Sequence, residues 1–312
     1  MNEILQKIQK AEHIVLISHV NPDADSLGST SAMYTFLLQN HKKVSWFCKT
    51  HNINQKLSFL PWFEKIKPAF PNSADLAISL DCASKERLGV HVECELINID
   101  HHVTNTNYGD LNFVQPEFIS TTAMLYDFFK ANNAKINKKM ATSLYAGILD
   151  DSDAFLSQSV DGMTFATVCE LIELGADFQL CNKKVLKSVS LAALRLKSVM
   201  FKNMTLEQDA RIALFCVSHE DMRASGAVAE DCKAPLEESL YLPSVEVALL
   251  LRQKKDFTIK GSLRSGFDVD VSKIAVKFGG GGHARRAGFE IDEVISLDEA
   301  KIKILNLLKK EL

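Results

Sequence analysis

The sequence predicts an α/β protein, with an N-terminal parallel-sheet domain followed by a smaller C-terminal α+β domain. Apolar strand-like runs alternate with helical patterns through the first half of the chain, as in sheets built from right-handed crossovers. After residue 209 the pattern changes to strand-like segments that include a hairpin. Acidic and histidine residues follow several strand ends, where sheets of this class collect ligands.

The first half contains the expected elements of the parallel sheet. Strands are expected at 13–18, 43–48, 75–80 and 96–99. Helical patterns cover 26–40, 120–132, 137–149 and 161–174. The run HIVLIS at 13–18 is continuously apolar, which is typical of a strand buried on both faces. These elements place the first domain at residues 1–182.

The second half contains a connection and a smaller domain. The apolar spacing predicts one connecting helix with a solvated basic face at 181–203, so the linker is placed at 183–206 and the second domain at 207–312. Ser218 is expected to cap a helix, with Asp221 in the capping-box position. The other expected elements are a strand at 211–217, a hairpin of 244–252 and 257–264, a helix at 271–277, a strand at 289–291 and a helix at 297–308.

Composition excludes several classes of protein. The 312 residues are 46% hydrophobic and 24% charged, an average globular composition that argues against disorder or a coiled coil. A net charge of −3 argues against a strongly basic nucleic-acid binder but allows a local basic patch. The seven cysteines are scattered without a C-x-x-C pair, which favours reduced thiols. Without a signal-peptide pattern or a long apolar run, a cytoplasmic protein with no membrane segment is expected.

Acidic and histidine residues gather directly after four apolar elements. They are His19, Asp23 and Asp25; Asp81; Asp100, His101 and His102; and Asp150, Asp151 and Asp153. Because the carboxyl ends of parallel strands share one edge, we expect these side chains to converge. Clustered carboxylates repel one another unless cations neutralise them. His and Asp ligands suit Mn²⁺, and also Zn²⁺, Co²⁺ or Fe²⁺, and the number of ligands suits two metals with a bridging carboxylate.

These acids also have an ordinary structural interpretation. Asp is common in turns, and Asp25 could simply cap the helix that begins at Ser26. This explanation competes for any single residue. It explains less well why His-x-x-x-Asp-x-Asp and Asp-His-His both follow apolar strands, so the metal site is favoured.

A second feature is the run Gly279–Gly282 followed by His283. Four consecutive glycines are not expected inside a helix or strand, and they expose backbone N–H groups to an anion. Arg264-Ser265 lies upstream, and the segment 245–290 has nine Lys or Arg against five Asp or Glu. A flexible linker with a surface histidine is the alternative. We favour a clamp for a phosphate or carboxylate.

These motifs together resemble the DHH phosphoesterase superfamily, named for the Asp-His-His at 100–102. The sequence is most similar to the two-domain branch that contains bacterial nanoRNases (oligoribonucleases) and 3′,5′-bisphosphonucleoside phosphatases. The matching segments are HVNPDADS at 19–26, Leu80-Asp81, Asp100–His102, Gly147–Phe155, and FGGGGHARRAG at 278–288. The last resembles the signature of the DHH-associated C-terminal domain, and the resemblance covers nearly the whole chain.

The resemblance implies a role for each matching residue. The first Mn²⁺ would be held by His19, Asp23 and Asp81, and the second by Asp25, Asp81, His101 and Asp151. Asp100 would orient a histidine, and His102 would contact the scissile phosphate or protonate the leaving oxygen. The other end of the substrate would be held by Arg264, Ser265, Gly280, Gly281, Gly282 and His283. A metal cleft between the two domains is expected, and Mg²⁺ or Co²⁺ could substitute for Mn²⁺.

The fourth motif departs from the family pattern. The family typically reads Asp-Thr-Gly-Xaa-Phe, often with Arg before the Phe, whereas this chain has Asp151-Ser152-Asp153-Ala154-Phe155. Alignment on the flanking residues selects Asp151, not Asp150, as the ligand. Asp153 replaces a glycine and Ala154 removes a candidate phosphate contact, which leaves substrate preference open.

The expected function is metal-dependent hydrolysis of short RNA or DNA oligonucleotides, or linear dinucleotides, to nucleoside monophosphates. Phosphatase activity on 3′,5′-bisphosphonucleosides is a further expectation, and a homodimer is kept open. The alternatives are a cyclic-dinucleotide phosphodiesterase, a single-strand DNA exonuclease and, from another class, a non-catalytic nucleotide-binding protein. The sequence does not rank the substrates or fix the cleavage polarity.

Overall fold

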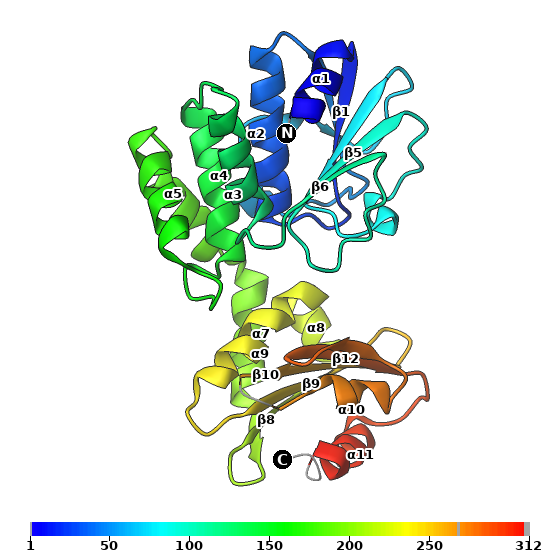
Figure 1. Cartoon of the computed structure of the whole chain (residues 1–312). Coiled ribbons are helices and arrows are strands. Elements are labelled where there is room, and N and C mark those ends of the chain that lie inside the picture. Colours follow the sequence, from blue (N-terminus) through cyan, green and yellow to red (C-terminus); the bar gives the residue numbers. More distant parts are fainter. Residues whose placement is uncertain (1, 267–268, 309–312) are drawn as a thin grey trace. The chain divides into compact units, whose positions relative to one another are not determined.

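The computed structural model describes residues 2–266 and 269–308, which form two compact units, Met1–Ser188 and Val189–Leu312 (Figure 1). Each unit has a six-stranded sheet and its own apolar core. The predicted α/β class, with a parallel-sheet unit before a smaller α+β unit, is confirmed. The predicted domain limits and the predicted cleft between the domains stay predictions.

The sheet of the first unit is entirely parallel. Its strands are β1 (His13–Ser18), β2 (Lys43–Phe47), β3 (Ile66–Lys67), β4 (Leu76–Leu80), β5 (Glu95–Asp100) and β6 (Leu111–Val114). They lie in the order β3-β2-β1-β4-β5-β6. The chain moves outward from β1 to β3 and then returns to β4 on the other side of β1. The switch point between β1 and β4 is where such sheets bind their ligands.

Helices cover this sheet, and one of them is buried along most of its length. They are α1 (Asn2–Lys10), α2 (Ala24–Gln39), α3 (Thr121–Ala131), α4 (Lys138–Asp151), α5 (Gly162–Glu173) and α6 (Phe178–Cys181), with short 3₁₀ turns at Gln55–Leu57, Phe63–Lys65 and Lys85–Leu88. The helix α2 packs against β1 and β2 and also against α3 and α4 (Figure 1). All its residues from Ala24 to Leu37 are buried. Several of its polar groups pair inside the protein, as Thr30 Oγ1 does with Ser18 Oγ at 2.8 Å.

Two helix boundaries differ from the prediction in ways that affect the site. The helix α2 begins at Ala24, and its N-cap is Asp23, whose side chain accepts the N–H of Ser26. Asp25 therefore does not cap α2, contrary to the structural alternative. Asp150 and Asp151 form the end of α4 and do not follow it, because Ser152 is the C-cap.

The predicted single helix at 181–203 is wrong. A π-helical turn at Asn182–Leu186 ends before Lys187, and α7 (Leu191–Lys202) begins after Ser190. The Ser190 side chain accepts the N–H of Ala193. A serine that caps a new helix satisfies N–H groups that a continuous helix would have bonded internally, so local capping overrides the apolar spacing.

The second unit has a mixed sheet with a core on each face. Its strands are β7 (Thr205–Glu207), β8 (Ile212–Val217), β9 (Val247–Gln253), β10 (Ile259–Ser265), β11 (Gly281–His283) and β12 (Arg286–Ile291), in the order β11-β12-β10-β9-β8-β7. Among the strands described in this unit, only β8 and β9 pair in parallel. One face packs on α10 (Ser272–Val276) and α11 (Leu297–Leu308), and the other packs on α7 and α9 (Lys233–Glu238).

The shorter helical elements of this unit are α8 (His219–Ser225), η5 (Ala229–Cys232) and η6 (Ser239–Tyr241). The predicted capping box of Ser218 and Asp221 is present at the start of α8. The predicted hairpin is formed by β9 and β10. None of the helices in the described parts of either unit is long and apolar enough to cross a membrane.

The glycine run contradicts the expectation that it contains no strand. Gly281, Gly282 and His283 form the edge strand β11, which is antiparallel to β12. A Cβ atom on Gly280 or Gly282 would lie 2.2 or 2.4 Å from a backbone oxygen of β12. The absence of side chains therefore allows the two backbones to approach closely enough to pair.

Candidate metal centre

The predicted ligands meet at the carboxyl end of the parallel sheet, beside its switch point. His19 follows β1 and Asp81 follows β4, while Asp100 ends β5 just before His101. Because β1, β4 and β5 are neighbours in register, these side chains share one edge of the sheet. The first turn of α2 and the last turn of α4 bring Asp25 and Asp151 to the same place.

Two overlapping groups of ligand atoms result. The first comprises His19, Asp23 and Asp81, and the second comprises Asp25, Asp81, His101 and Asp151. Within each group the atoms lie within 4.8 Å of one another, and Asp81 belongs to both. His19 Nε2 lies 3.7 Å from an oxygen of Asp23 and 3.7 Å from one of Asp81. A further grouping joins Asp81, His101 and His102.

Asp81 is held in an unusual backbone conformation. Its φ is 60°, in the left-handed region that few residues other than glycine occupy. Its N–H donates to the carbonyl of Ile99 at 3.0 Å, and its Oδ1 accepts the Thr121 hydroxyl at 3.0 Å. The residue is buried, and its carboxylate belongs to every group of candidate ligands. Strain of this kind persists where the surroundings overdetermine the position.

Asp25 is fixed by the N-terminus of α3. Its two oxygens accept the N–H groups of Thr121 and Thr122 at 2.7 and 3.0 Å, and the Thr122 hydroxyl donates to it at 2.5 Å. The positive end of the helix dipole and these donors stabilise a buried carboxylate. Sequence reasoning missed both threonines, although Ser120-Thr121-Thr122 at a predicted helix start is a signal for such a site.

Asp100 and His102 form a hydrogen-bonded pair beside the candidate metal ligands. His102 Nδ1 lies 2.7 Å from Asp100 Oδ1, which also accepts the N–H of His101 at 2.9 Å. Burial disfavours the charged form of Asp100, but hydrogen bonds from His102 and Asn105 outweigh it and lower its pKa. The carboxylate therefore holds Nδ1 as the protonated nitrogen and leaves His102 Nε2 for another partner.

The cluster carries uncompensated negative charge. Burial, followed by the charges of the other aspartates, raises the pKa of Asp81 well above its ordinary value and that of Asp151 to about 7. Burial of His101 is outweighed by Asp151 and the other carboxylates, which raise its pKa to about 10. Such shifts mark a site that lacks a compensating charge.

The donor set fits divalent metal ions. His101 Nε2 is buried and makes no hydrogen bond, although it lies 3.0 Å from Asp151 Oδ2 and 3.6 Å from Asp81 Oδ1. A cation between these atoms would satisfy the nitrogen and both carboxylates. Imidazole and carboxylate without thiolate suit Mn²⁺ and similar ions.

Arg87 is a contact that the sequence did not indicate. It lies in the 3₁₀ turn after β4, and its Nη2 is 3.0 Å from His19 Nδ1. Its carbonyl accepts the N–H of Val20 at 2.8 Å, which ties this turn to the loop after β1.

Asp150 and Asp151 have different surroundings, which gives a testable contrast. Asp150 Oδ2 accepts the N–H of Ala24 at 2.9 Å and so supports the start of α2. We expect Asp151→Ala to reduce kcat/KM at least a hundredfold. Asp150→Ala should cost about 0.5–2 kcal/mol of stability, as loss of a helix cap does, with a smaller loss of activity. Steady-state kinetics and thermal unfolding of both variants check this, and a larger kinetic loss for Asp150→Ala would reverse the assignment.

The departure in the fourth motif forms a left-handed turn. Asp153, Ala154 and Phe155 have φ values of 49°, 55° and 68°. Ser152 Oγ accepts the N–H of Phe155 at 3.0 Å and stabilises the turn. Glycine adopts this conformation more readily than aspartate, which accounts for the glycine at this position in the family pattern. Asp153 is not among the grouped ligands of the described residues.

The predicted substrate contacts belong to the second unit and differ in exposure. Arg264 Nε lies 3.2 Å from Glu237 Oε1, and Arg286 Nη2 lies 3.0 Å from the same oxygen. Burial lowers the pKa of Arg264, as does the neighbouring charge of Arg286. His283 is exposed on β11, whereas Ser265 is buried. Gly280 lies before β11, and Gly281 and Gly282 lie within it. Their role in substrate binding stays a prediction.

Comparison with known proteins places these features in a family. Residues 13–148 match the DHH family N-terminal domain, and residues 212–311 match the DHHA1 domain. The first unit therefore contains a DHH family N-terminal domain, and the second contains a DHHA1 domain. The predicted resemblance is therefore confirmed. All but one of the clustered ligands fall inside the DHH match, and Asp151 follows it.

Several DHH relatives are similar along nearly the whole chain. A Streptococcus mutans protein named "Probable bifunctional oligoribonuclease and PAP phosphatase NrnA" is 26% identical, with 98% of each chain covered. A Thermus thermophilus protein named bifunctional oligoribonuclease and PAP phosphatase NrnA is 29% identical, covering 99% of this chain and 93% of that one. The crystal structure of an exopolyphosphatase-related protein from Bacteroides fragilis has a TM-score of 0.88 at 24% identity, covering 98% and 94%. It shares the DHH fold.

Proposed function

We propose that this chain is a metal-dependent phosphodiesterase that hydrolyses short oligonucleotides and linear dinucleotides to nucleoside monophosphates. The observation that carries this proposal is the pair of ligand groups that share the buried Asp81. Two adjacent sites that share a carboxylate suit hydrolysis of a phosphate ester, where charge develops on the attacking and leaving oxygens. The names of the relatives from S. mutans and T. thermophilus support oligoribonucleotides as the substrate class.

We assign two Mn²⁺ ions to the cluster, with Mg²⁺ or Co²⁺ as substitutes. The first would be held by His19, Asp23 and Asp81, and the second by Asp25, Asp81, His101 and Asp151. When bound, such a pair supplies an acidified water and neutralises charge on the phosphoryl group.

In this proposal, Asp100 orients the imidazole of His102, and His102 supplies a proton. Asp100 is acceptor-only when ionised, so it keeps the proton of His102 on Nδ1. The imidazole is then oriented with Nε2 available to the substrate. When Nε2 also carries a proton, it could contact the scissile phosphate or protonate the leaving oxygen and return to the neutral form with its remaining proton on Nδ1. A charged imidazolium would be stabilised by the same carboxylate. The N-terminus of α3 holds Asp25 in place through the same reaction, because its donors belong to rigid backbone.

Removal of metal tests the proposal directly. Dialysis against excess chelator should abolish hydrolysis of a labelled RNA trinucleotide, and Mn²⁺ should restore it best among divalent ions because the ligands are His and Asp. Circular dichroism before and after dialysis controls for unfolding. Turnover that continues undiminished in excess chelator would exclude a metal-dependent reaction.

A panel of substrates separates the candidate activities. With Mn²⁺ present, the panel contains RNA of two to about twenty nucleotides, single-stranded DNA and cyclic dinucleotides. Preference for two to five nucleotides is expected, whereas preference for long DNA or for cyclic dinucleotides would favour the corresponding alternative. Binding without turnover of any substrate would favour a non-catalytic nucleotide-binding protein. A cytoplasmic location and a homodimer stay predictions.

A second candidate activity is dephosphorylation of 3′,5′-bisphosphonucleosides. Several relatives carry this activity in their names alongside oligoribonuclease. The same metal cluster could hydrolyse a monoester, and release of inorganic phosphate from 3′,5′-bisphosphoadenosine measures it.

Arg264 offers a test of the anchoring role of the second unit. Arg264→Ala should lower kcat/KM for a dinucleotide about ten- to a hundredfold, since a charge-assisted bond to phosphate is worth about 1.5–3 kcal/mol. A bis-nitrophenyl phosphate diester has no distal phosphate and should be hydrolysed at a nearly unchanged rate. Equal losses on both substrates would mean that Arg264 supports the fold or the metal cluster.

A further inference from the structure

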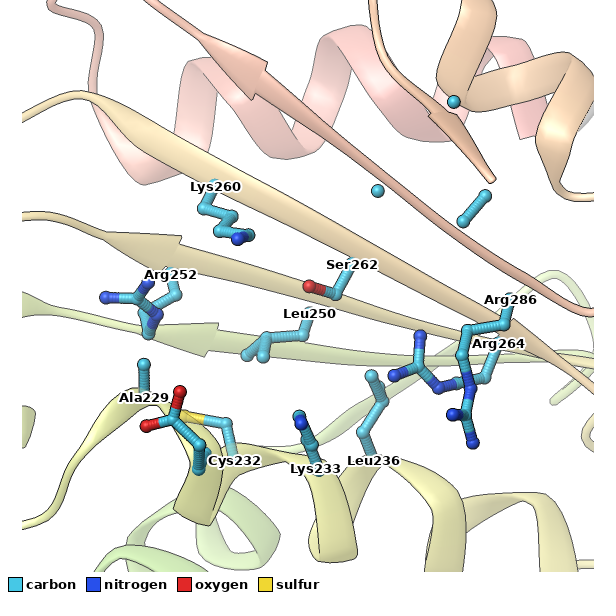
Figure 2. Close-up of a pocket in the computed structure, with 14 residues that line it drawn as sticks. Ala229, Cys232, Lys233, Leu236, Leu250, Arg252, Lys260, Ser262, Arg264 and Arg286 are labelled. Carbon is cyan, nitrogen blue, oxygen red and sulfur yellow. The ribbon is translucent and has the colours of Figure 1, made fainter. Parts of the chain in front are cut away.

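The second unit contains a pocket between its sheet and the helical segments η5 and α9 (Figure 2). Its volume is about 310 Å³, and its walls come from η5 and α9 on one side and from β9, β10 and β12 on the other. Of the predicted substrate contacts, Arg264 and Gly281 line it. The pocket also contains basic side chains to which neither the sequence motifs nor the family pattern assigns a role.

The middle of the pocket is formed by a row of neighbouring residues on three strands, whose side chains become smaller from β9 to β12. Leu250 of β9 pairs with Ser262 of β10, which pairs with Gly288 of β12. Leu250 packs with Leu236 of α9 in the apolar core beneath the helices. Beyond Leu250, Ser262 and Gly288 are the small residues of this row, so the middle of the pocket stays open toward β12.

At one end of the pocket, part of the positive charge is compensated by a carboxylate of the protein. Arg264 and Arg286 are direct partners across β10 and β12, and like charges in such positions repel. Glu237 of α9 accepts from both guanidinium groups at 3.2 and 3.0 Å. This carboxylate relieves the repulsion and orients the pair.

The opposite end has a similar pair without such a carboxylate. Lys260 and Arg252 are direct partners across β10 and β9, and both line the pocket with Lys233 of α9. Within the described residues none of the three forms an ion pair. Glu290 lies opposite Lys260 on β12, but its carboxylate pairs with Lys254 at 3.0 Å. Glu230, the acid on the pocket wall, lies within ion-pair distance of none of them.

We propose that Arg252, Lys260 and Lys233 bind a second phosphate of a single-stranded oligonucleotide, apart from the phosphate that Arg264 is predicted to bind. This inference rests on the proposed function and adds a substrate subsite to it. Lys260 and Arg264 are four residues apart on one strand, which separates them by about 13 Å. One phosphate does not span that distance, so the two ends of the pocket hold two anionic groups. The strip of Leu250 and Ser262 between them accepts the intervening part of the strand, which at this distance is more than one nucleoside.

The chemistry of the three side chains matches a phosphodiester. Arg252 can donate two parallel N–H bonds to phosphate oxygens, and the lysines add point charge. A bound phosphate would relieve the repulsion between Arg252 and Lys260, as Glu237 does at the other end. Each phosphate contact also releases a counterion, so binding must weaken as salt rises, with a slope that counts the contacts.

The test compares two charge reversals on the same hairpin. Lys260→Glu changes a pocket residue, and Lys255→Glu changes an exposed lysine in the turn outside the pocket. Both are made in the full-length chain carrying Asp81→Asn, so that turnover does not consume the probe. Binding of a fluorescent RNA tetranucleotide is measured with Mn²⁺ at several salt concentrations. Thermal unfolding shows whether each chain is folded, and Arg252→Ala provides a second variant.

Lys260→Glu should weaken binding about tenfold or more and reduce the slope of log K against log salt by about 0.7, the value for one contact to a single strand. Lys255→Glu should change neither quantity appreciably. Equal affinities and slopes for the two reversals would overturn the subsite, as would absence of RNA binding by the parent chain. Hydrolysis of the same RNA by the wild-type chain is measured separately. If that hydrolysis fails while the Lys260 effect remains, the proposed function is wrong and the subsite stands.

Discussion

Replacing Asp81 with alanine should reduce hydrolysis of a short RNA by many orders of magnitude while the fold persists. Asp81 is the one residue common to all three ligand groups found in the described residues, so its loss would remove a ligand from both proposed metals. The reaction would then lack the paired charge that stabilises its transition state. The fold should persist because burial raises the pKa of Asp81 and makes its charge a cost to stability.

The measurement combines single-turnover kinetics with metal content and thermal unfolding. Asp161→Ala is a suitable control, because Asp161 is the N-cap of α5 and lies outside the metal cluster. It should lower stability by about 1 kcal/mol, as loss of a cap does, without changing kcat/KM. Wild-type activity in Asp81→Ala would rule out a shared ligand at this position.

Gly147→Ala should also disable the candidate metal centre. In this variant no ligand is removed, and the cause is a steric clash of the new methyl group. A Cβ atom on Gly147 would lie 2.4 Å from Asp25 Oδ1 and 2.5 Å from the Thr122 hydroxyl. These atoms belong to a buried hydrogen-bonded group that cannot move without breaking its bonds to α3. We expect a loss of about 1–3 kcal/mol in stability, as in overpacked cores, and at least a hundredfold loss of kcat/KM.

Gly162→Ala is the matched control for this variant. Gly162 begins α5, and no atom lies within 4 Å of the position where its Cβ would be. The same substitution there should be neutral or slightly stabilising, since alanine favours the helix. Unfolding midpoints and kinetics of the two variants separate a general effect of alanine from the displacement of Asp25. Unchanged activity in a folded Gly147→Ala chain would mean that Asp25 does not need this position.

The apolar runs were sufficient to predict four of the six strands of the first unit, because buried parallel strands have a strong pattern. The strand at 13–18 has the predicted limits. The candidate ligands could be predicted because parallel sheets of this class bind ligands at the carboxyl ends of their strands. The pattern did not reveal β3 and β6, which are short and only partly buried. Segments of two and four residues are too short for an apolar run or an alternating pattern to stand out.

Other differences between the prediction and the structure depend on contacts between segments that are distant in the sequence or on local capping. The break after Lys187 depends on the capping of α7 by Ser190, and β11 exists only because β12 offers a backbone beside glycines. The donors Thr121 and Thr122 are nearly one hundred residues from Asp25. Their contact with it follows from the tertiary packing of α2, α3 and α4. The basic pocket likewise requires strand register, which spacing along the sequence does not reveal.

The scattering of the ligands along the chain has a thermodynamic consequence. The clustered side chains come from segments between residues 19 and 151, all within the first unit. An ion that binds only when these segments are assembled acts as a cross-link that exists in the native state alone. By linkage, each site at a hundred times its dissociation constant adds about 2.7 kcal/mol to the unfolding free energy. The second unit, with its own cores and no share in the cluster, gains nothing directly. Metal availability therefore changes the stability of the first unit relative to that of the second.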